Sequence, residues 1–184
     1  NKDNSVHDEY MNAHNTFSEG GDCGFVQPFC DSPLEHDNAG ENLYVSIISR
    51  AKSYVYIFTP YLILGTELSQ AMISAARSGV DIRLVIPKIP DKKLIYLQTK
   101  ANIGPLIKAG VRIYLYTPGF IHSKCIVADD STAIVGTCNL DFRSMYWNFE
   151  DFVYMYNTQC IGKIKEDALE TFAVSEEVDE ESTD

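Results

Sequence analysis

Apolar residues fall along this chain in short blocks that turn residues separate from one another. Blocks rich in β-branched and aromatic residues, several of them stopped by proline, are typical of strands. Between the earlier blocks, apolar residues recur at helical spacing. The pattern predicts strands at residues 54–59, 82–86, 111–116, 121–128, 133–135 and 151–156, and helices at residues 43–51, 67–78, 94–109 and 157–172.

Local signals refine these boundaries. Asn42 and Thr66 stand where side chains cap the first turn of a helix, so both are predicted N-caps. Pro105 is expected to interrupt the third helix, because proline has no N–H and its ring crowds the preceding turn. Residues 24–29 contain a proline and are therefore expected to form a short edge strand. Asp130-Ser131 is a predicted hairpin turn.

The order of the elements indicates the class of fold. Strands and helices alternate up to residue 116, and three strands then follow without a helix between them. This order predicts an α/β fold in which a mixed β-sheet is sandwiched between helices. Residues 1–22 are expected to be a flexible lead-in, residues 23–172 the folded domain, and residues 173–184 an acidic tail that is disordered from Glu176 onward.

The charge of the 184 residues is concentrated at the two ends. The formal net charge is −11, but residues 1–42 hold one Lys and nine Asp or Glu, and residues 166–184 hold nine Asp or Glu with no basic residue. Residues 43–165 therefore carry fourteen basic and eight acidic side chains, a net +6. A basic body suits an anionic phosphodiester substrate, although solvated surface charge explains the same numbers equally well.

Three further features bound the function. The sequence has neither an apolar run long enough to span a bilayer nor an initial signal peptide, and its start at Asn1 suggests a piece of a longer protein. The five cysteines form no C-x-x-C pair, so we expect no zinc or other metal site. Cys125 and Cys138 are expected to be buried, and a Cys23–Cys30 disulfide is an alternative that requires an oxidising compartment.

The clearest chemical signal runs from residue 122 to residue 150. His122 and Lys124 are two positions apart, so in an extended segment their side chains share one face. After a glycine-marked turn, Thr137 and Asn139 repeat this spacing with a hydroxyl and an amide. A nucleophile or proton shuttle, a fixed cation and two neutral donors suit a phosphate group on which negative charge develops.

The spacing H-x-K-x(4)-D, followed by G-T-x-N, resembles the phospholipase D superfamily. Further runs resemble more closely the second catalytic half of bacterial cardiolipin synthases, and the likeness extends from about residue 40 to about residue 160. A lone H-x-K has little specificity, whereas the combined pattern in this order is specific. The runs that carry the resemblance are Asn139 to Ser144, Asn148 to Glu150, Thr59 to Tyr61, and Ala75 to Ile82.

The resemblance implies roles for individual residues. His122 forms a phospho-histidine intermediate or acts as general acid and base, and the likeness to a second half favours the acid and base role. Lys124 holds a phosphate oxygen as a fixed charge, and Asn139 donates to the same phosphate. Glu150 is expected to hydrogen-bond the His122 imidazole, while the rival carboxylate Asp151 faces away because strand side chains alternate.

Four other side chains belong to the candidate set. Asp129 is part of the signature and is grouped with the catalytic residues, but its place between a strand and a turn favours a structural role. Thr137 either adds a hydroxyl to the phosphate site or shapes the turn. Arg143 either contacts the headgroup or forms a local ion pair with Asp141. Tyr61 follows a strand and is expected to line the site.

Taken with the resemblance, these residues imply the catalytic domain of a cardiolipin synthase. It would move a phosphatidyl group between phosphatidylglycerol molecules, releasing glycerol, without a cofactor. The alternatives are a phosphodiester hydrolase (a phospholipase or nuclease) active as a dimer, and an inactive folded fragment. The implied partners are an anionic phospholipid, a first catalytic half or a second copy of this chain, and the cytoplasmic face of the cell membrane, but no nucleic acid. Three lysines could meet headgroups or simply be solvated: Lys88, Lys92 and Lys93.

Overall fold

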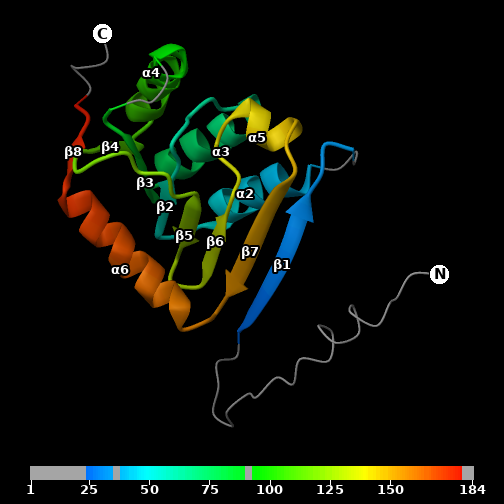
Figure 1. The fold of residues 1–184 in the computed structure, drawn as a ribbon. Coiled ribbons are helices and arrows are strands. Elements are labelled where there is room, and N and C mark those ends of the chain that lie inside the picture. Colours follow the sequence, from blue (N-terminus) through cyan, green and yellow to red (C-terminus); the bar gives the residue numbers. More distant parts are fainter. Residues whose placement is uncertain (1–23, 35–37, 90–92, 180–184) are drawn as a thin grey trace.

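The computed structural model describes residues 24–34, 38–89 and 93–179 as a mixed eight-stranded sheet with helices on both faces (Figure 1). This arrangement confirms the predicted α/β class. The strands are β1 (Phe25–Asp31), β2 (Tyr54–Phe58), β3 (Asp81–Pro87), β4 (Arg112–Tyr116), β5 (Cys125–Ala128), β6 (Thr132–Gly136), β7 (Glu150–Tyr156) and β8 (Ser175–Glu177). The helices are α2 (Ala39–Arg50), α3 (Thr66–Arg77), α4 (Lys93–Lys108), α5 (Phe142–Tyr146) and α6 (Cys160–Ala173).

The strand order in the sheet is β1-β7-β6-β5-β2-β3-β4-β8. β2, β3 and β4 are parallel and are joined by α3 and α4, whereas β5, β6, β7 and β1 form an antiparallel run beside β2. The parallel strands at the centre lie between helical layers, so β2 reads as an uninterrupted apolar run and all five of its residues are buried. β1 pairs only with β7, and its Pro28 is tolerated because this is an edge strand, as predicted.

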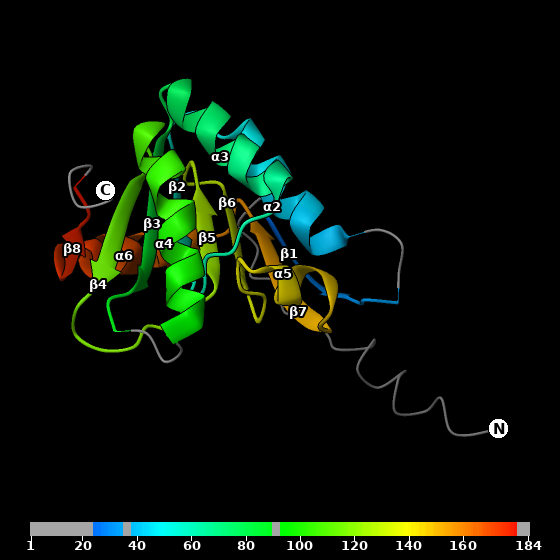
Figure 2. The ribbon, with the colours of Figure 1, turned by 90° about the horizontal axis from the view of Figure 1, so that it is seen from above.

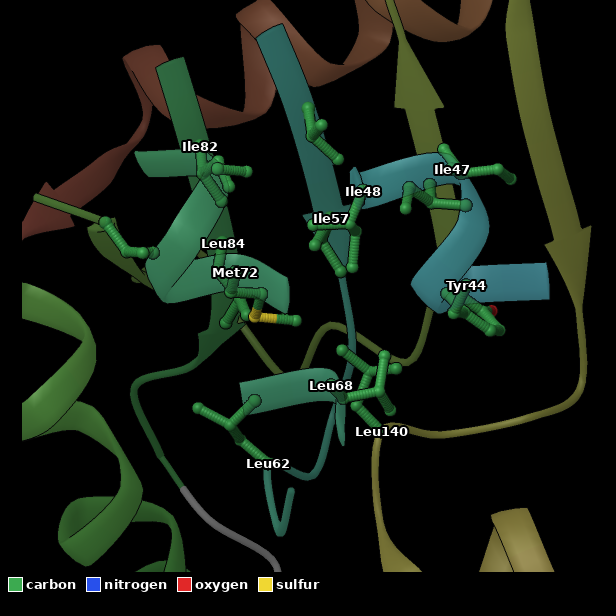
Figure 3. Close-up of a cluster of buried hydrophobic side chains, with 14 of the residues drawn as sticks. Tyr44, Ile47, Ile48, Ile57, Leu62, Leu68, Met72, Ile82, Leu84 and Leu140 are labelled. Carbon is green, nitrogen blue, oxygen red and sulfur yellow. The ribbon is translucent and has the colours of Figure 1, made fainter. Parts of the chain in front are cut away.

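Two separate cores hold the layers together. On one face, α2 and α3 pack against the sheet, and Figure 3 shows Ile48 of α2, Met72 of α3 and Ile57 of β2 pointing toward one another. On the other face, Phe172 of α6 packs against aromatic side chains of the central strands, including Tyr56 of β2. The view from above shows α2 and α3 together on one side of the sheet (Figure 2). Burial of each such side chain stabilises the fold by roughly 1.5–3 kcal/mol.

Two predicted helix starts are wrong. α2 begins at Ala39, a turn earlier than expected, because the Asn38 side chain accepts a hydrogen bond of 3.2 Å from the backbone N–H of Glu41 and so caps the helix in place of Asn42. α3 begins at Thr66 itself, after Gly65 as N-cap, and no side-chain cap forms there. In both cases a residue outside the apolar stripe fixes the first turn, so the hydrophobic pattern could not locate it.

The predicted interruption at Pro105 is also wrong, since α4 continues through this residue to Lys108. Proline removes one backbone hydrogen bond of the helix. Nearby residues of α4, Ile103 and Leu106, are buried in the core that α2 and α3 share with the sheet. Their burial offsets the lost hydrogen bond, so tertiary packing overrides the local signal.

The acidic end of the chain is partly ordered, contrary to the prediction of a disordered tail. Ser175–Glu177 forms β8, which pairs with β4 in antiparallel fashion. Lys88 and Glu176 form an ion pair of 2.5 Å, and Arg112 and Glu177 one of 2.7 Å. Lys88 is thus paired with a carboxylate of the chain itself. Residues 1–23, Lys92 and the end of the tail from residue 180 lie outside the described residues.

Candidate active site

The candidate residues gather at one edge of the sheet. The parallel strands β2, β3 and β4 end at this edge, and the antiparallel strands β5 and β7 begin there. His122 and Lys124 lie just before β5, Asn139 just after β6, and Glu150 opens β7. Tyr61 follows β2 at the same edge. The carboxyl ends of parallel strands are the usual place for a site in an α/β sheet.

His122 and Lys124 are in direct contact. Lys124 Nζ lies 2.9 Å from His122 Nδ1 and donates to the His122 carbonyl oxygen at 2.7 Å. The predicted strand over residues 121–128 is too long, because β5 begins only at Cys125, yet the two side chains still meet as expected. A lysine ammonium can only donate, so His122 Nδ1 is the acceptor when this contact is a hydrogen bond from a protonated Lys124. The imidazole is exposed at the sheet edge.

Lys124 is a buried cation, with 8% of the residue exposed. Burial lowers the pKa of Lys124, and the negative charges of Glu150 and Asp141 oppose part of that shift. The ammonium therefore lacks full solvation while it remains close to two carboxylates. An anion placed beside it gains more than it would beside an exposed lysine, because charges interact more strongly where the effective dielectric constant is lower.

The Glu150 carboxylate is 5% exposed and does not reach His122 in the described structure. It accepts a hydrogen bond from the Thr137 hydroxyl and another of 3.1 Å from Asn148 Nδ2. The predicted Glu150–His122 hydrogen bond is therefore wrong for the described chain, where Lys124 contacts His122 Nδ1 instead. The charge of Glu150 acts on Lys124, whose pKa it raises. Asp151 is exposed and points away from Glu150, as the alternation of β7 predicted.

Thr137 is held by β7. Its hydroxyl donates to Glu150 and accepts the backbone N–H of Asp151 at 3.0 Å. Gly136 precedes it because a Cβ there would collide with the Asp151 carbonyl oxygen. The turn role that the sequence left open for Thr137 is the one that these bonds support.

Asn139 is oriented by Ser144, a residue that the sequence reasoning missed. Asn139 Nδ2 donates to Ser144 Oγ at 3.0 Å, and Ser144 is 3% exposed. Asn139 Oδ1 is buried and, among the described residues, has no hydrogen-bond partner. The backbone N–H of Ser144 donates to Asp141 Oδ1 at 2.8 Å, which caps α5. The spacing Asp141-x-x-Ser144 before a short apolar run was the available sign of this cap.

Asp141 is thus a buried cap, and the local ion pair with Arg143, one of the two alternatives that the sequence left open, is not formed within the described residues. Arg143 is exposed on α5 and lines a cavity of about 410 Å³ together with Tyr61 and Asn139. The segment after β2 is tied to the segment after β6, because Ile63 N–H donates to the Leu140 carbonyl at 2.8 Å. This bridge is what brings Tyr61 beside Asn139.

Asp129 lies at the opposite end of β5 from Lys124 and does not belong to the site. Its carboxylate accepts the backbone N–H groups of Lys52 at 2.6 Å, Ser53 at 2.8 Å and Tyr54 at 3.0 Å. Burial alone would raise the pKa of Asp129. The three hydrogen bonds together lower this pKa by more than burial raises it, so the net pKa is below the ordinary value. Asp129 anchors the entry to β2, which agrees with the structural role expected from its position.

The cysteines of the described residues are thiols. Cys125 and Cys138 are buried, as predicted, and burial raises the pKa of Cys125 to about 12, so neither is a ready nucleophile. Cys30 is a free thiol, and Cys23 lies outside the described residues. Within the described ranges, no three His, Cys, Asp or Glu side chains converge in a way that could hold a metal ion. No helix in the same ranges is long and apolar enough to cross a membrane.

Known proteins resemble this chain in both sequence and fold. The model of the phospholipase D-like domain of cardiolipin synthase matches residues 44–171. A cardiolipin synthase of Geobacillus kaustophilus is 38% identical over 158 residues, which are 86% of this chain and 32% of that protein. An uncharacterized protein of Streptococcus mutans is 50% identical over 155 residues, 84% of this chain and 34% of its own length. The chain therefore spans about a third of the curated relatives it matches.

The fold has solved counterparts. The phospholipase D family member Nuc from Salmonella typhimurium superimposes with a TM-score of 0.71 at 18% identity, covering 84% of this chain and 98% of its own. The phosphatidylserine synthase of Haemophilus influenzae gives a TM-score of 0.69 at 15% identity, covering 84% of this chain and 40% of its own. At these identities the likeness shows the fold. With the family model matching well over half of the chain, this protein belongs to the phospholipase D-like domain family of cardiolipin synthases.

Proposed function

We propose that the chain is a catalytic half of a cardiolipin synthase, which transfers a phosphatidyl group from one phosphatidylglycerol to the hydroxyl of another. The observation that carries this proposal is the contact of 2.9 Å between His122 and Lys124, at a sheet edge that also holds Asn139. The membership of the family and the relatives named cardiolipin synthases favour transfer over hydrolysis.

The reaction takes place in two displacements. A histidine nitrogen attacks phosphorus, and the bond from phosphorus to the oxygen of the headgroup glycerol breaks. This glycerol leaves with a proton from the opposing histidine. The hydroxyl of a second phosphatidylglycerol then loses its proton to that histidine and attacks phosphorus, the phosphorus–nitrogen bond breaks, and cardiolipin forms. We assign His122 the proton transfer, the role that the resemblance to a second catalytic half favours, and its Nδ1 contacts Lys124.

The other side chains stabilise the charge on the phosphate and hold the site in place. Lys124 leaves His122 Nδ1 for a non-bridging oxygen when the phosphate arrives, and Asn139 adds an amide donor. Arg143 and Tyr61, which line the cavity beside Asn139, contact the rest of the headgroup. Glu150 lies close enough to Lys124 to oppose part of the lowering of the Lys124 pKa by burial. The site uses no cofactor.

A complete site needs a second set of these groups. An in-line displacement places the attacking group and the leaving-group acid on opposite sides of phosphorus. The described chain supplies one His122 and one Lys124, so the partner is a first catalytic half or a second copy of this chain. The substrate is an anionic phospholipid at the cytoplasmic face of the cell membrane, and we expect no nucleic-acid partner.

Replacement of His122 by alanine in the gene product that contains this chain tests the proposal. Conversion of labelled phosphatidylglycerol into cardiolipin and glycerol should fall about a thousandfold or more, as when a nucleophile or its proton partner is removed. Ser123 is the exposed neighbour of His122, and Ser123→Ala is the control substitution that should retain activity. Near-normal cardiolipin formation by a folded His122→Ala variant would rule out the assignment.

A further inference from the structure

α5 and the residues after it present exposed aromatic side chains beside the site. Trp147 is 69% exposed, Phe149 70% and Phe142 49%, and all three lie in the eight-residue segment 142–149. The rings of Phe142 and Trp147 meet edge to face, with centroids 5.7 Å apart. We call these three aromatic residues, together with Arg143, the aromatic patch. Large exposed apolar groups that cluster in this way mark a surface that contacts something apolar.

The aromatic patch opens onto the candidate active site. Phe142, Arg143 and Trp147 line the same cavity of about 410 Å³ as Asn139. A molecule that covers the aromatic patch therefore reaches the residues proposed to hold the phosphate. Figure 1 shows α5 beside the beginning of β7, the strand that Glu150 opens.

The charges around the aromatic patch favour an anionic partner. The protein carries a formal net charge of −11, yet residues 142–149 contain one Arg and no acidic residue. The acidic residues on either side, Asp141 and Glu150, are buried and accept hydrogen bonds from the chain itself. Arg143 is thus the one charge within the aromatic patch and favours an anionic surface there, while the exposed carboxylates of Asp151, two residues after Phe149, and of Glu67, close to Tyr146, lie beside it.

The aromatic patch is held rigidly, although α5 has only five residues. Asp141 caps the amino end of α5, and the Tyr146 hydroxyl donates to Glu41 Oε2 of α2 at 2.5 Å. A patch that is already in place loses little conformational freedom when it is covered. Its aromatic rings therefore remain available at the surface rather than folding back onto α5.

We propose that the aromatic patch inserts into the headgroup region of an anionic phospholipid bilayer and so brings lipid phosphates to the cavity beside Asn139. The inference extends the proposed function, because a lipid-using site must meet its substrate at the depth of the phosphates. Tryptophan and phenylalanine suit this depth, since their rings enter the apolar boundary while the indole N–H stays among polar groups. Arg143 pairs with the lipid phosphates there.

Trp147 is the single tryptophan of the sequence, so its fluorescence reports on the aromatic patch alone. The 184-residue chain is titrated with vesicles of phosphatidylglycerol and phosphatidylcholine in equal parts, and separately with phosphatidylcholine alone. The emission of Trp147 should move to shorter wavelength with the first vesicles and much less with the second. Lipids brominated near the headgroup should quench it more than lipids brominated at the chain end.

Variants locate the contact. Phe149→Ala should weaken binding to the anionic vesicles by about tenfold, as measured through Trp147, and Trp147→Ala by a similar factor in co-sedimentation. Arg143→Gln should reduce the difference between anionic and neutral vesicles. Leu169→Ala removes an apolar side chain that is 42% exposed on α6, away from the aromatic patch, and should bind like the unaltered chain. All four sites are at least partly exposed, and circular dichroism verifies folding.

Two outcomes would overturn the proposal. One is binding to anionic vesicles that leaves the Trp147 emission unchanged, or no binding at all. The other is a shift in emission that appears without lipid as the protein is concentrated, together with dimers in sedimentation, which makes the aromatic patch a contact between copies. Vesicle binding needs no catalysis, so His122→Ala should bind normally. Normal vesicle binding by this chain, with no cardiolipin synthesis by the gene product that contains it, would refute the proposed function and leave this inference standing.

Discussion

Single residues at this sheet edge divide into the proposed phosphate ligands and those that hold the backbone. The H-x-K-x(4)-D signature contains both kinds, since Lys124 lies in the site and Asp129 lies at the far end of β5. Asp129 also has a positive φ of 51°, which aspartate and asparagine tolerate better than most residues. A signature therefore records what the fold needs as well as what the chemistry needs.

Asp129→Asn should destabilise the fold by about 2–3 kcal/mol at pH 7, because an amide cannot accept all three backbone N–H groups. The pKa of Asp129 is below its ordinary value in the folded state, so its stabilising contribution is present above the unfolded pKa and lost as pH falls through the folded pKa. Urea unfolding at pH 7 and near pH 3 measures both effects. Asp130→Asn is the control and should cost about 1 kcal/mol or less, since its bond to Lys165 is exposed.

Ser144 is predicted to position Asn139. In Ser144→Ala, Asn139 Nδ2 loses its acceptor and the amide is free to turn away from the phosphate. We expect kcat for cardiolipin formation to fall about tenfold with a small change in KM, because a positioning residue acts on the transition state. Steady-state kinetics of the gene product measure this split. An equal fall in the Ser123→Ala control would show that the loss has another origin.

At the scale of elements, the sequence was sufficient to predict strands that are buried on both faces of the sheet. It failed to predict elements whose formation depends on polar side chains. β2 was predicted because every one of its residues is buried. α5 was not, because a helix of five residues has too few apolar positions to show a period, and only its cap at Asp141 marks it. β8 was missed for a related reason, since ion pairs such as Arg112–Glu177 hold an acidic segment that reads as disordered.

α5 is predicted to depend on the hydrogen bond between Tyr146 and Glu41. Glu41 is buried, and its Oε1 has no hydrogen-bond partner among the described residues. Tyr146→Phe would leave Glu41 Oε2 without its closest hydrogen-bond donor, which should destabilise the protein by about 2 kcal/mol. Hydrogen exchange should also speed up in α5 before the rest of the chain. Tyr156→Phe, on an exposed end of β7, is the control and should change neither measurement appreciably.

At the scale of the molecule, the polar groups of one active-site half stand at an open sheet edge. His122 is exposed there and packs against the ring of Phe120, which is itself 41% exposed. The contact that the sequence suggested between Glu150 and His122 is absent within the described chain, whereas every other proposed phosphate ligand lies at this edge. The spacing placed His122 and Lys124 on one face, but it could not decide whether the imidazole takes Lys124 or Glu150 as its partner.

The isolated chain is predicted to be catalytically silent as a monomer. It offers one His122 and one Lys124, and an in-line displacement needs a second proton-transferring group across phosphorus. Any activity should therefore rise with the square of the protein concentration where dimers are scarce. Sedimentation and a phosphodiesterase assay on the same samples measure this dependence. Mixing in an excess of the His122→Ala chain should suppress the activity, because mixed dimers lack one histidine, whereas an excess of Leu169→Ala chain should not. A strictly monomeric species that turns over a phosphodiester, and loses this activity in His122→Ala, would show that one half suffices.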